Sequence, residues 1–315
     1  MPASVNPHVL LDELQAAEGT GAEALALWLA RCSDPVLRGG LRVIGARDAA
    51  HARLARRRLA ALGGTPGSAP SRQLQSLCGM LTASDVSNRS KLAVLLSQFP
   101  ASTNDPLPAV LDDLDDETRA LVETIRDDDL ASLRWLREVE ELLGTMQEPG
   151  PSTPVNDLLG LLDAYRAAEQ AGAEVVAAWR DACALPGLRG GLDTIAEREA
   201  THAALLEARL RELGGAARAR VDDDVVARAR ERFGASDLSD EEKLAVTVER
   251  YVDDDSVAGT LRAAILALGD DPETREMLRL IVAGEAATFA WLRSYRRAIA
   301  SRPREVSLRV LDGGR

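Results

Sequence analysis

The sequence is poor in cysteine and in aromatic residues, and each scarcity excludes a class of protein. The 315 residues include three cysteines and no Cys-x-x-Cys pair, which excludes a disulfide framework and a thiolate zinc or rubredoxin-type iron site. Aromatic residues make up 3% of the chain. Because pleated sheets favour aromatic and β-branched residues, this composition favours helices. Cys32 and Cys183 lie within apolar stripes, so we expect buried, inert thiols.

A basic surplus and a long hydrophobic run are also missing. The net charge is −12 and the estimated pI is 4.9, whereas a protein that binds nucleic acid normally needs a basic face. No stretch of about 18 consecutive apolar residues occurs, and the N-terminus lacks the charged and apolar regions of a signal peptide. We therefore expect a cytoplasmic protein that contacts neither nucleic acid nor a membrane.

What the sequence does contain is an internal duplication. Segments of the first half recur in the second at a constant offset of 151 residues, without a gap over about 55 residues, which indicates a duplicated domain. The matches are Leu10-Leu11-Asp12 with Leu161-Leu162-Asp163, Glu18 with Glu169, Trp28 with Trp179, Cys32 with Cys183, Arg38-Gly39-Gly40-Leu41 with Arg189-Gly190-Gly191-Leu192, and His51 with His202.

The repeat and the apolar periodicity predict an all-α protein made of two tandem four-helix bundles with extra short helices. We expect a first domain over residues 1–147, a proline-rich linker over 148–155, a second domain over 156–300 and a tail over 301–315. Helices are predicted over 9–32, 36–62, 73–82, 88–99 and 116–144, with a segment near 107–114, and then over 156–184, 186–213, 222–233, 239–252, 256–268 and 272–300.

On the first helix of each repeat, a glutamate occupies the centre of the apolar stripe. Leu162, Gly172 and Val176 flank Glu169 at helical spacing, and Glu18 has the same surroundings in the first repeat. A buried carboxylate is expensive unless something compensates its charge. These glutamates are therefore candidates for a functional site.

The second and last helices repeat this anomaly. Glu199 and His202 share one face of the second helix, as Asp48 and His51 do in the first repeat. A spacing of three residues places carboxylate and imidazole on neighbouring turns, where both can reach one ion. On the last helix Glu285 is followed three residues later by Thr288.

The remaining candidates are an acid on the last helix of the first repeat and one on a shorter helix of the second. Asp129, followed by Ser132, is the counterpart of Glu285. Glu249 lies between Val246 and Val252 on the third principal helix.

The order of these residues resembles the ligand pattern of the ferritin-like di-iron carboxylate bundles: a Glu, a Glu-x-x-His, a Glu and a second Glu-x-x-His on successive helices. Glu169, Glu199-x-x-His202, Glu249 and Glu285-x-x-Thr288 follow that order. The 30-residue step from Glu169 to Glu199 is also similar to that of rubrerythrin-like members. The resemblance covers essentially the whole chain as two tandem domains.

This resemblance implies a non-haem metal site in the second repeat. Glu199 and Glu285 would bridge two ions, Glu169 and Glu249 would be terminal ligands, and His202 would be the single nitrogen ligand. Many oxygen ligands and few nitrogens suit iron or manganese better than copper or zinc. The implied activity is oxidative, with O₂ or peroxide acting on iron or a small-molecule substrate and with electrons from a separate donor protein.

The first repeat departs further from the family pattern. Glu18, Asp48, His51 and Asp129 remain, but Ser97 stands where the third-helix acid would be. We therefore expect a degenerate site in the first repeat beside a near-complete one in the second. A diverged tandem does not repeat one interface around a closed shell, so we expect a homodimer rather than a storage cage.

The alternative hypothesis is a metal-free pseudoenzyme that serves as a helical binding or scaffolding module. In that case the buried acids would pair with arginines, and Arg47 and Arg198 directly precede the acids of the second helices. The glycine pairs Gly39-Gly40 and Gly190-Gly191 predict close packing of the first helix on the second.

Overall fold

The prediction of an all-α protein is confirmed by the computed structural model. It describes residues 6–99, 111–142, 155–235, 237–250, 265 and 271–301, and this part of the chain contains helices and no strand. Four segments lie outside the described residues: the expected helix over 256–268 apart from Ile265, the first half of the segment near 107–114, the linker before Val155 and the tail after Ser301.

The helices begin and end close to the positions that the sequence predicts. In the first repeat they are α1 (Pro7–Arg31), α2 (Pro35–Ala61), α3 (Arg72–Thr82), α4 (Asn88–Ser97) and α6 (Asp116–Leu142). In the second repeat they are α7 (Val155–Ala182), α8 (Pro186–Glu212), α9 (Asp223–Gly234), α10 (Asp240–Arg250) and α12 (Pro272–Ala300).

Local signals explain where the second helix of each repeat begins and ends. The Asp34 carboxylate caps α2 by accepting a hydrogen bond of 2.9 Å from the Leu37 amide, and Pro35 fits the first turn. Beyond the helix ends, Gly63 and Gly214 have φ angles of 81° and 80°. Only glycine adopts this left-handed conformation readily, so these glycines end α2 and α8.

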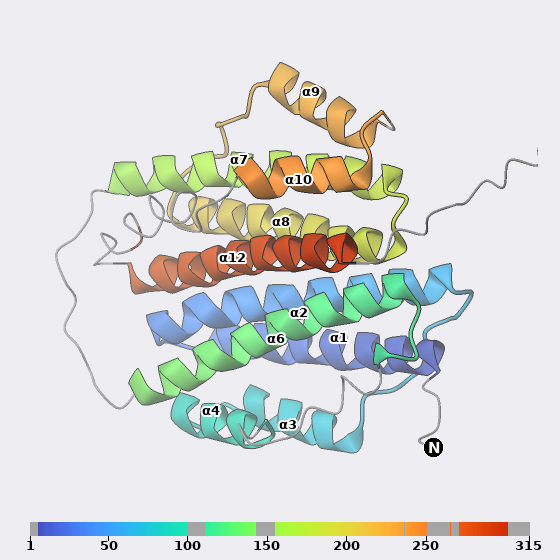
Figure 1. The fold of residues 1–315 in the computed structure, drawn as a ribbon. Coiled ribbons are helices and arrows are strands. Elements are labelled where there is room, and N and C mark those ends of the chain that lie inside the picture. Colours follow the sequence, from blue (N-terminus) through green and yellow to red (C-terminus); the bar gives the residue numbers. More distant parts are fainter. Residues whose placement is uncertain are drawn as a thin grey trace, which may run out of the picture.

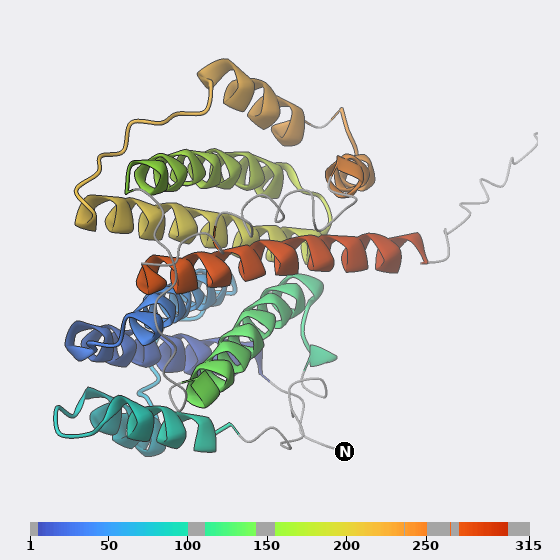
Figure 2. The same ribbon diagram turned by 90° about the vertical axis from the view of Figure 1, so that its left-hand side faces the viewer.

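The repeats are stacked, with α12 between α8 and α2 and with α6 running obliquely from α4 towards α12 (Figures 1 and 2). Within each repeat the first two helices form a hairpin, α1 with α2 and α7 with α8. The last helices are exchanged: α6 packs more on α8 than on α2, and α12 packs more on α2 than on α8. Helices α3 and α4 cover one end of this stack and α9 covers the other (Figure 2).

The glycine pairs allow this exchanged packing. A Cβ atom on Gly39 would lie 2.4 Å from the Glu273 carbonyl oxygen on α12, and one on Gly190 would lie 2.2 Å from the Glu117 carbonyl oxygen on α6. The first glycine of each pair therefore packs closely on the last helix of the other repeat, whereas Gly40 and Gly191 pack on tryptophans of the last helix of their own repeat. The expectation that the first helix packs here was wrong, because periodicity does not identify the partner of an apolar face.

Ion pairs repeat the same symmetry. Arg38 on α2 lies 2.9 Å from Glu273 on α12, and Arg189 on α8 lies 3.5 Å from Glu117 on α6. Each arginine follows the start of a second helix, and each glutamate lies in the first turn of the other repeat's last helix. The repeats are thus related by an approximate two-fold axis that passes between α2 and α8.

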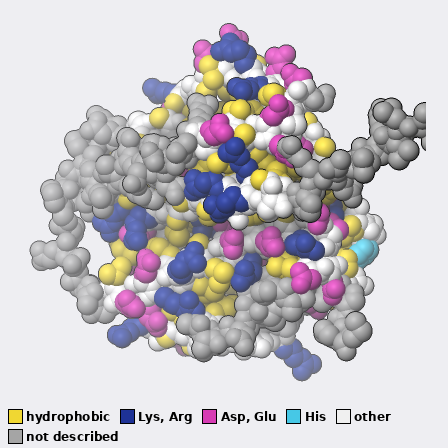
Figure 3. Space-filling model, viewed as in Figure 1, with side chains coloured by type: hydrophobic (Ala, Val, Ile, Leu, Met, Phe, Trp, Pro, Cys, Tyr) yellow, Lys and Arg dark blue, Asp and Glu magenta, His cyan; other side chains and the backbone are white. Residues whose placement is uncertain are grey.

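The hydrophobic core continues from one repeat into the other. One cluster of buried side chains contains Trp28, Leu41 and Trp135 of the first repeat together with Leu206 and Ile281 of the second. At the surface, acidic and basic side chains are interspersed over the face seen in Figure 3. Within the described ranges, no helix combines the length and the apolar character needed to cross a membrane.

We predict that Gly191→Ala destabilises the protein by about 1–3 kcal/mol, the usual cost of overpacking. The added Cβ would lie 1.9 Å from the indole ring of Trp291, and this clash outweighs the gain of about 1 kcal/mol in helix propensity. Urea denaturation monitored by circular dichroism measures the effect. Gly160→Ala is the control, since that helical glycine has no atom within 4 Å of the added Cβ, and it should stabilise. Equal shifts in both variants would contradict the packing described here.

Candidate metal centres

The first repeat gathers four potential metal ligands between α1, α2 and α6. Glu18, Asp48, His51 and Asp129 each offer one ligand atom, and these atoms lie within 4.8 Å of one another. They come from the first, second and last helices, because each residue lies on the stripe of its helix that faces the other two. The sequence predicted all four residues, and the structure brings them together.

His51 occupies the centre of this group. Its side chain is buried, and its Nδ1 atom lies 3.4 Å from a carboxylate oxygen of Glu18 and 3.4 Å from one of Asp129. Neither contact has hydrogen-bond geometry, so Nδ1 is a buried nitrogen without a hydrogen-bond partner. A buried polar atom in this state requires an explanation such as a bound ion, and a cation between nitrogen and carboxylates would provide one.

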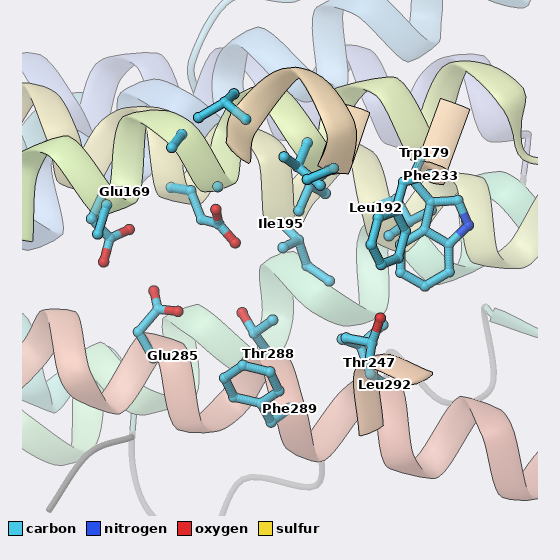
Figure 4. A pocket seen from close by; sticks show the side chains of 18 of the residues that line it. Glu169, Trp179, Leu192, Ile195, Phe233, Thr247, Glu285, Thr288, Phe289 and Leu292 are labelled. Carbon is cyan, nitrogen blue, oxygen red and sulfur yellow. The ribbon is translucent and has the colours of Figure 1, made fainter. Parts of the chain in front are cut away.

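The second repeat forms the matching group between α7, α8 and α12. Glu169, His202 and Glu285 offer ligand atoms within 4.8 Å of one another. His202 Nδ1 lies 3.3 Å from Glu169 and 3.0 Å from Glu285. Glu169 and Glu285 face each other across the gap between their helices (Figure 4).

Glu199 lies beside this group but is not among the residues whose ligand atoms all lie within 4.8 Å of one another. A Cβ atom on Gly172 of α7 would lie 1.9 Å from a Glu199 carboxylate oxygen, and one on Gly21 of α1 would lie 3.0 Å from Asp48. The glycine in the stripe of each first helix therefore makes room for the acid of the second helix. This space for a carboxylate is present in both repeats.

Both groups concentrate negative charge in a buried setting. Burial raises the pKa of the Glu18 carboxyl, and the charge of Asp129 raises it further; burial and Glu18 likewise raise the pKa of Asp48. In the second repeat, burial and the charge of Glu285 raise the pKa of both Glu169 and Glu199. Protons or a cation must therefore neutralise part of this charge.

The pKa values of the two histidines are raised, although burial alone would lower them. Burial alone would lower the pKa of His51, but the neighbouring carboxylates of Asp128, Asp129 and Glu18 raise it well above its usual value. For His202, burial is likewise outweighed by Glu169 and Glu285, which raise its pKa. Without a metal each imidazole holds a proton that compensates the carboxylates, and a bound cation would take over that role.

Neither α10, which carries Glu249, nor α4, which ends at Ser97, contributes a ligand to either group. Glu249 on α10 is exposed and forms an ion pair of 3.0 Å with Arg296, and Ser97 at the end of α4 is also exposed. On α10, Leu244 is buried and Val248 packs on the core. Glu249 is one residue beyond Val248, about 100° around the helix. The structure therefore does not bring Glu249 to the predicted site.

The number of ligands that each repeat brings together also differs from the prediction. The sequence favoured the second repeat as the more complete site, yet the first repeat brings together four residues and the second three. The reason is that the missing third-helix acid, which made the first repeat look eroded, is not part of either group.

Asp128 is a site residue that the sequence analysis missed. It is buried, and its carboxylate lies 3.3 Å from His51 Nε2 and 2.9 Å from the Arg198 guanidinium. Although burial alone would raise the pKa of Asp128, the charge of Arg198 and the bond to His51 hold it well below its usual range. A signal was present, because the buried residues of α6 at 121, 125, 132, 135 and 139 follow a heptad-like spacing that includes 128.

Arg198 connects the two groups. It belongs to the second repeat, but it pairs with Asp128 of the first. It also donates a hydrogen bond of 2.5 Å to Thr288, the residue that stands where the family pattern has a second histidine. Arg198 is thus bound to Asp128 and Thr288 rather than to the Glu199 carboxylate that follows it in sequence.

The second repeat has no carboxylate at the position that corresponds to Asp128. Gly284 precedes Glu285 as Asp128 precedes Asp129, and it offers no carboxylate. Arg47 donates instead to the Leu280 carbonyl, and its Nε and Nη1 atoms and His202 Nε2 have no hydrogen-bond partner. Burial lowers the pKa of Arg47. Each imidazole therefore has one hydrogen-bonded nitrogen, Nε2 in His51 and Nδ1 in His202.

The comparisons with known proteins found no match: no protein-family model, no curated protein and no solved structure is similar to this chain. The evidence for its function is therefore the geometry of the two groups.

We predict that Asp128→Asn destabilises the protein by about 3–5 kcal/mol, because it leaves the buried Arg198 charge uncompensated. Since the pKa of Asp128 is lowered in the folded state, its stabilisation is present above the ordinary aspartate pKa and is lost as the pH falls. Urea denaturation at pH 7 and at a pH below the ordinary aspartate pKa of about 3.9 measures this. Asp127→Asn, on the exposed neighbouring residue, should change stability by less than about 0.5 kcal/mol. Similar costs for both variants would contradict the assignment.

We predict that Glu199→Gln stabilises the metal-free protein at pH 8 but not near pH 4. The raised pKa of Glu199 means that its stabilising contribution is present below the ordinary glutamate pKa of about 4.3 and is lost as the pH rises through the folded-state pKa. The glutamine mimics the protonated carboxyl at every pH. Thermal unfolding in the presence of a chelator tests this, with the exposed Glu249→Gln as the control. A gain that does not depend on pH would overturn the prediction.

Proposed function

We propose that the protein is a ferritin-like metalloprotein that binds iron or manganese at its acid and histidine clusters. We further propose that the second cluster is the reactive one and supports oxidation of a small molecule by O₂ or peroxide. The observation that carries the proposal is the duplicated geometry: in each repeat a buried histidine Nδ1 lies between carboxylates of the first and last helices.

The donor chemistry supports this assignment. In the first repeat Glu18, Asp48, Asp129 and His51 would hold a cation with three carboxylates and one nitrogen. In the second, Glu169, Glu285 and His202 would do so, with Glu199 close by. Sets rich in oxygen with one imidazole suit iron or manganese.

The surrounding residues position the ligands. Asp128 accepts a hydrogen bond from His51 Nε2, the type of contact that fixes the orientation of a metal-ligating imidazole. Arg198 fixes both Asp128 and Thr288, and so holds the last helices of both repeats in register. The second imidazole lacks such a partner, which leaves it freer to adjust during a reaction.

When bound, a redox-active metal would supply electron transfer to O₂ or peroxide. The chain's own residues would bind the ion, limit water and admit the substrate. The second cluster suits this role because Glu169, Glu199 and Glu285 line a cavity. Cys32 and Cys183 are buried, so we propose that electrons come from a separate protein.

Metal titration tests the proposal. We predict that the chelator-treated protein binds Mn²⁺ and, anaerobically, Fe²⁺ at up to one or two ions per cluster, as measured by calorimetry and by metal analysis after gel filtration. Glu169→Gln combined with Glu285→Gln should abolish binding at the second cluster and leave the first. His51→Ala should weaken the first cluster by more than about 10–100-fold, the cost of losing an outer-shell partner of a ligand, because His51 would be a ligand itself.

Glu249→Gln is the matched control, because this exposed acid belongs to neither cluster, and it should leave the binding isotherm unchanged. If the wild-type protein holds far less than one ion per chain and the cluster variants behave like Glu249→Gln, the metal assignment is wrong. A metal-free binding or scaffolding module would then be the better description.

A further inference from the structure

We infer that the cavity beside the second cluster binds a lipophilic small molecule that carries no carboxylate or phosphate group. The role of this molecule as the substrate rests on the proposed function, whereas its binding does not. The inference is carried by the size of the cavity, the apolar face of α9 and the distribution of charge along the cavity walls.

The cavity has a volume of about 540 Å³, within the range of about 300–1,000 Å³ that is typical of sites for drug-sized ligands. Its walls come from α7, α8, α9, α10 and α12, and most of the lining side chains are apolar. Val176, Ile195, Val246, Phe289 and Leu292 are representative, one or more from each wall except that of α9. An apolar molecule of this size would replace water along most of its length.

The apolar face that α9 turns toward the cavity supports a ligand in this space. None of its residues is buried, although Val225, Val226, Ala229 and Phe233 line the cavity with an apolar face. Val225 is 48% exposed. Leaving such surface in water forgoes roughly 25 cal/mol per Å², and a lipophilic ligand beneath α9 would recover that stabilisation.

The two ends of the cavity differ in chemistry. At one end Glu169 and Glu285 point toward each other, and at the other Trp179 and Phe233 lie together (Figure 4), with ring centroids 5.3 Å apart. Thr288 lies between the two ends (Figure 4). A ligand therefore has its apolar end against the aromatic pair and its other end beside the carboxylates.

The charge at the carboxylate end excludes anionic ligands. Glu169, Glu199 and Glu285 are the acids of the cavity wall, and its one arginine, Arg232, is exposed on α9. Three carboxylates exceed the charge of a single divalent cation, so this end stays negative with one such ion bound. An anionic head group would be repelled, whereas a hydroxyl or ammonium group is compatible.

Three probes of equal chain length test this inference: 1-decanol, decylamine and decanoate, titrated by calorimetry into the metal-free protein and into protein that holds one Mn²⁺ ion at the second cluster. We predict saturable binding of decanol and decylamine with one molecule per chain. Decanoate should bind at least about tenfold more weakly, a difference of about 1.4 kcal/mol. Equal affinity for decanoate, or no saturable binding of any probe, overturns the inference.

Two cavity-filling variants locate the site. Ala168→Phe on α7 and Ala286→Phe on α12 place a ring into the cavity from different walls, so that one is informative if the other fails to fold. Each should weaken decanol binding by at least about tenfold. Ala17→Phe is the matched control, since Ala17 holds the position of Ala168 in the first repeat and is exposed. A control that loses binding as the cavity variants do would contradict the location.

The two proposals fail separately. Decanol binding that is lost in Ala168→Phe, in a protein that holds no metal, leaves the cavity site standing and removes the proposed function. If the protein binds metal, the Glu169→Gln and Glu285→Gln changes abolish that binding, and decanol does not bind, the proposed function stands and the cavity site is wrong. Circular dichroism on every variant separates loss of binding from loss of fold.

Discussion

The close approach of helix backbones at the glycine pairs is the constraint on which the rest of the structure depends. Gly39 and Gly190 let the last helix of one repeat lie against the second helix of the other. Helices α2 and α8 also contact each other directly, and the last helix of each repeat contacts both of them. In that position α6 presents Asp129 to His51 of its own repeat and places Asp128 between His51 and Arg198 of the opposite repeat.

Helix positions and most cluster residues could be predicted from the sequence, because both follow from the local period of a helix. An acid centred on an apolar stripe, as Glu18 and Glu169 are, is visible without knowing what the stripe faces. The exchange of α6 and α12 could not be predicted, since the two stripes are alike and either fits either partner. Asp128 was missed for a related reason: it lies between His51 of its own repeat and Arg198 of the other, and the sequence does not show that α6 contacts the second repeat.

The two clusters are unequal both in their ligands and in their surroundings. The first brings together four potential ligands and the second three. Asp128 bonds to His51 and is itself bound by Arg198. His202 has Gly284 where that carboxylate would be, and its cluster lines a large apolar cavity.

The reciprocal contacts between the repeats are those of an isologous interface, in which each surface patch meets its own counterpart. Arg38 with Glu273 and Arg189 with Glu117 are the same contact seen from both sides. In a homodimer of single repeats, every substitution would appear twice at such an interface. Joining the copies in one chain removes that restriction, so position 128 can be an aspartate while its counterpart, position 284, is a glycine. Covalent fusion thus permits a two-fold assembly to carry different chemistry on its two sides.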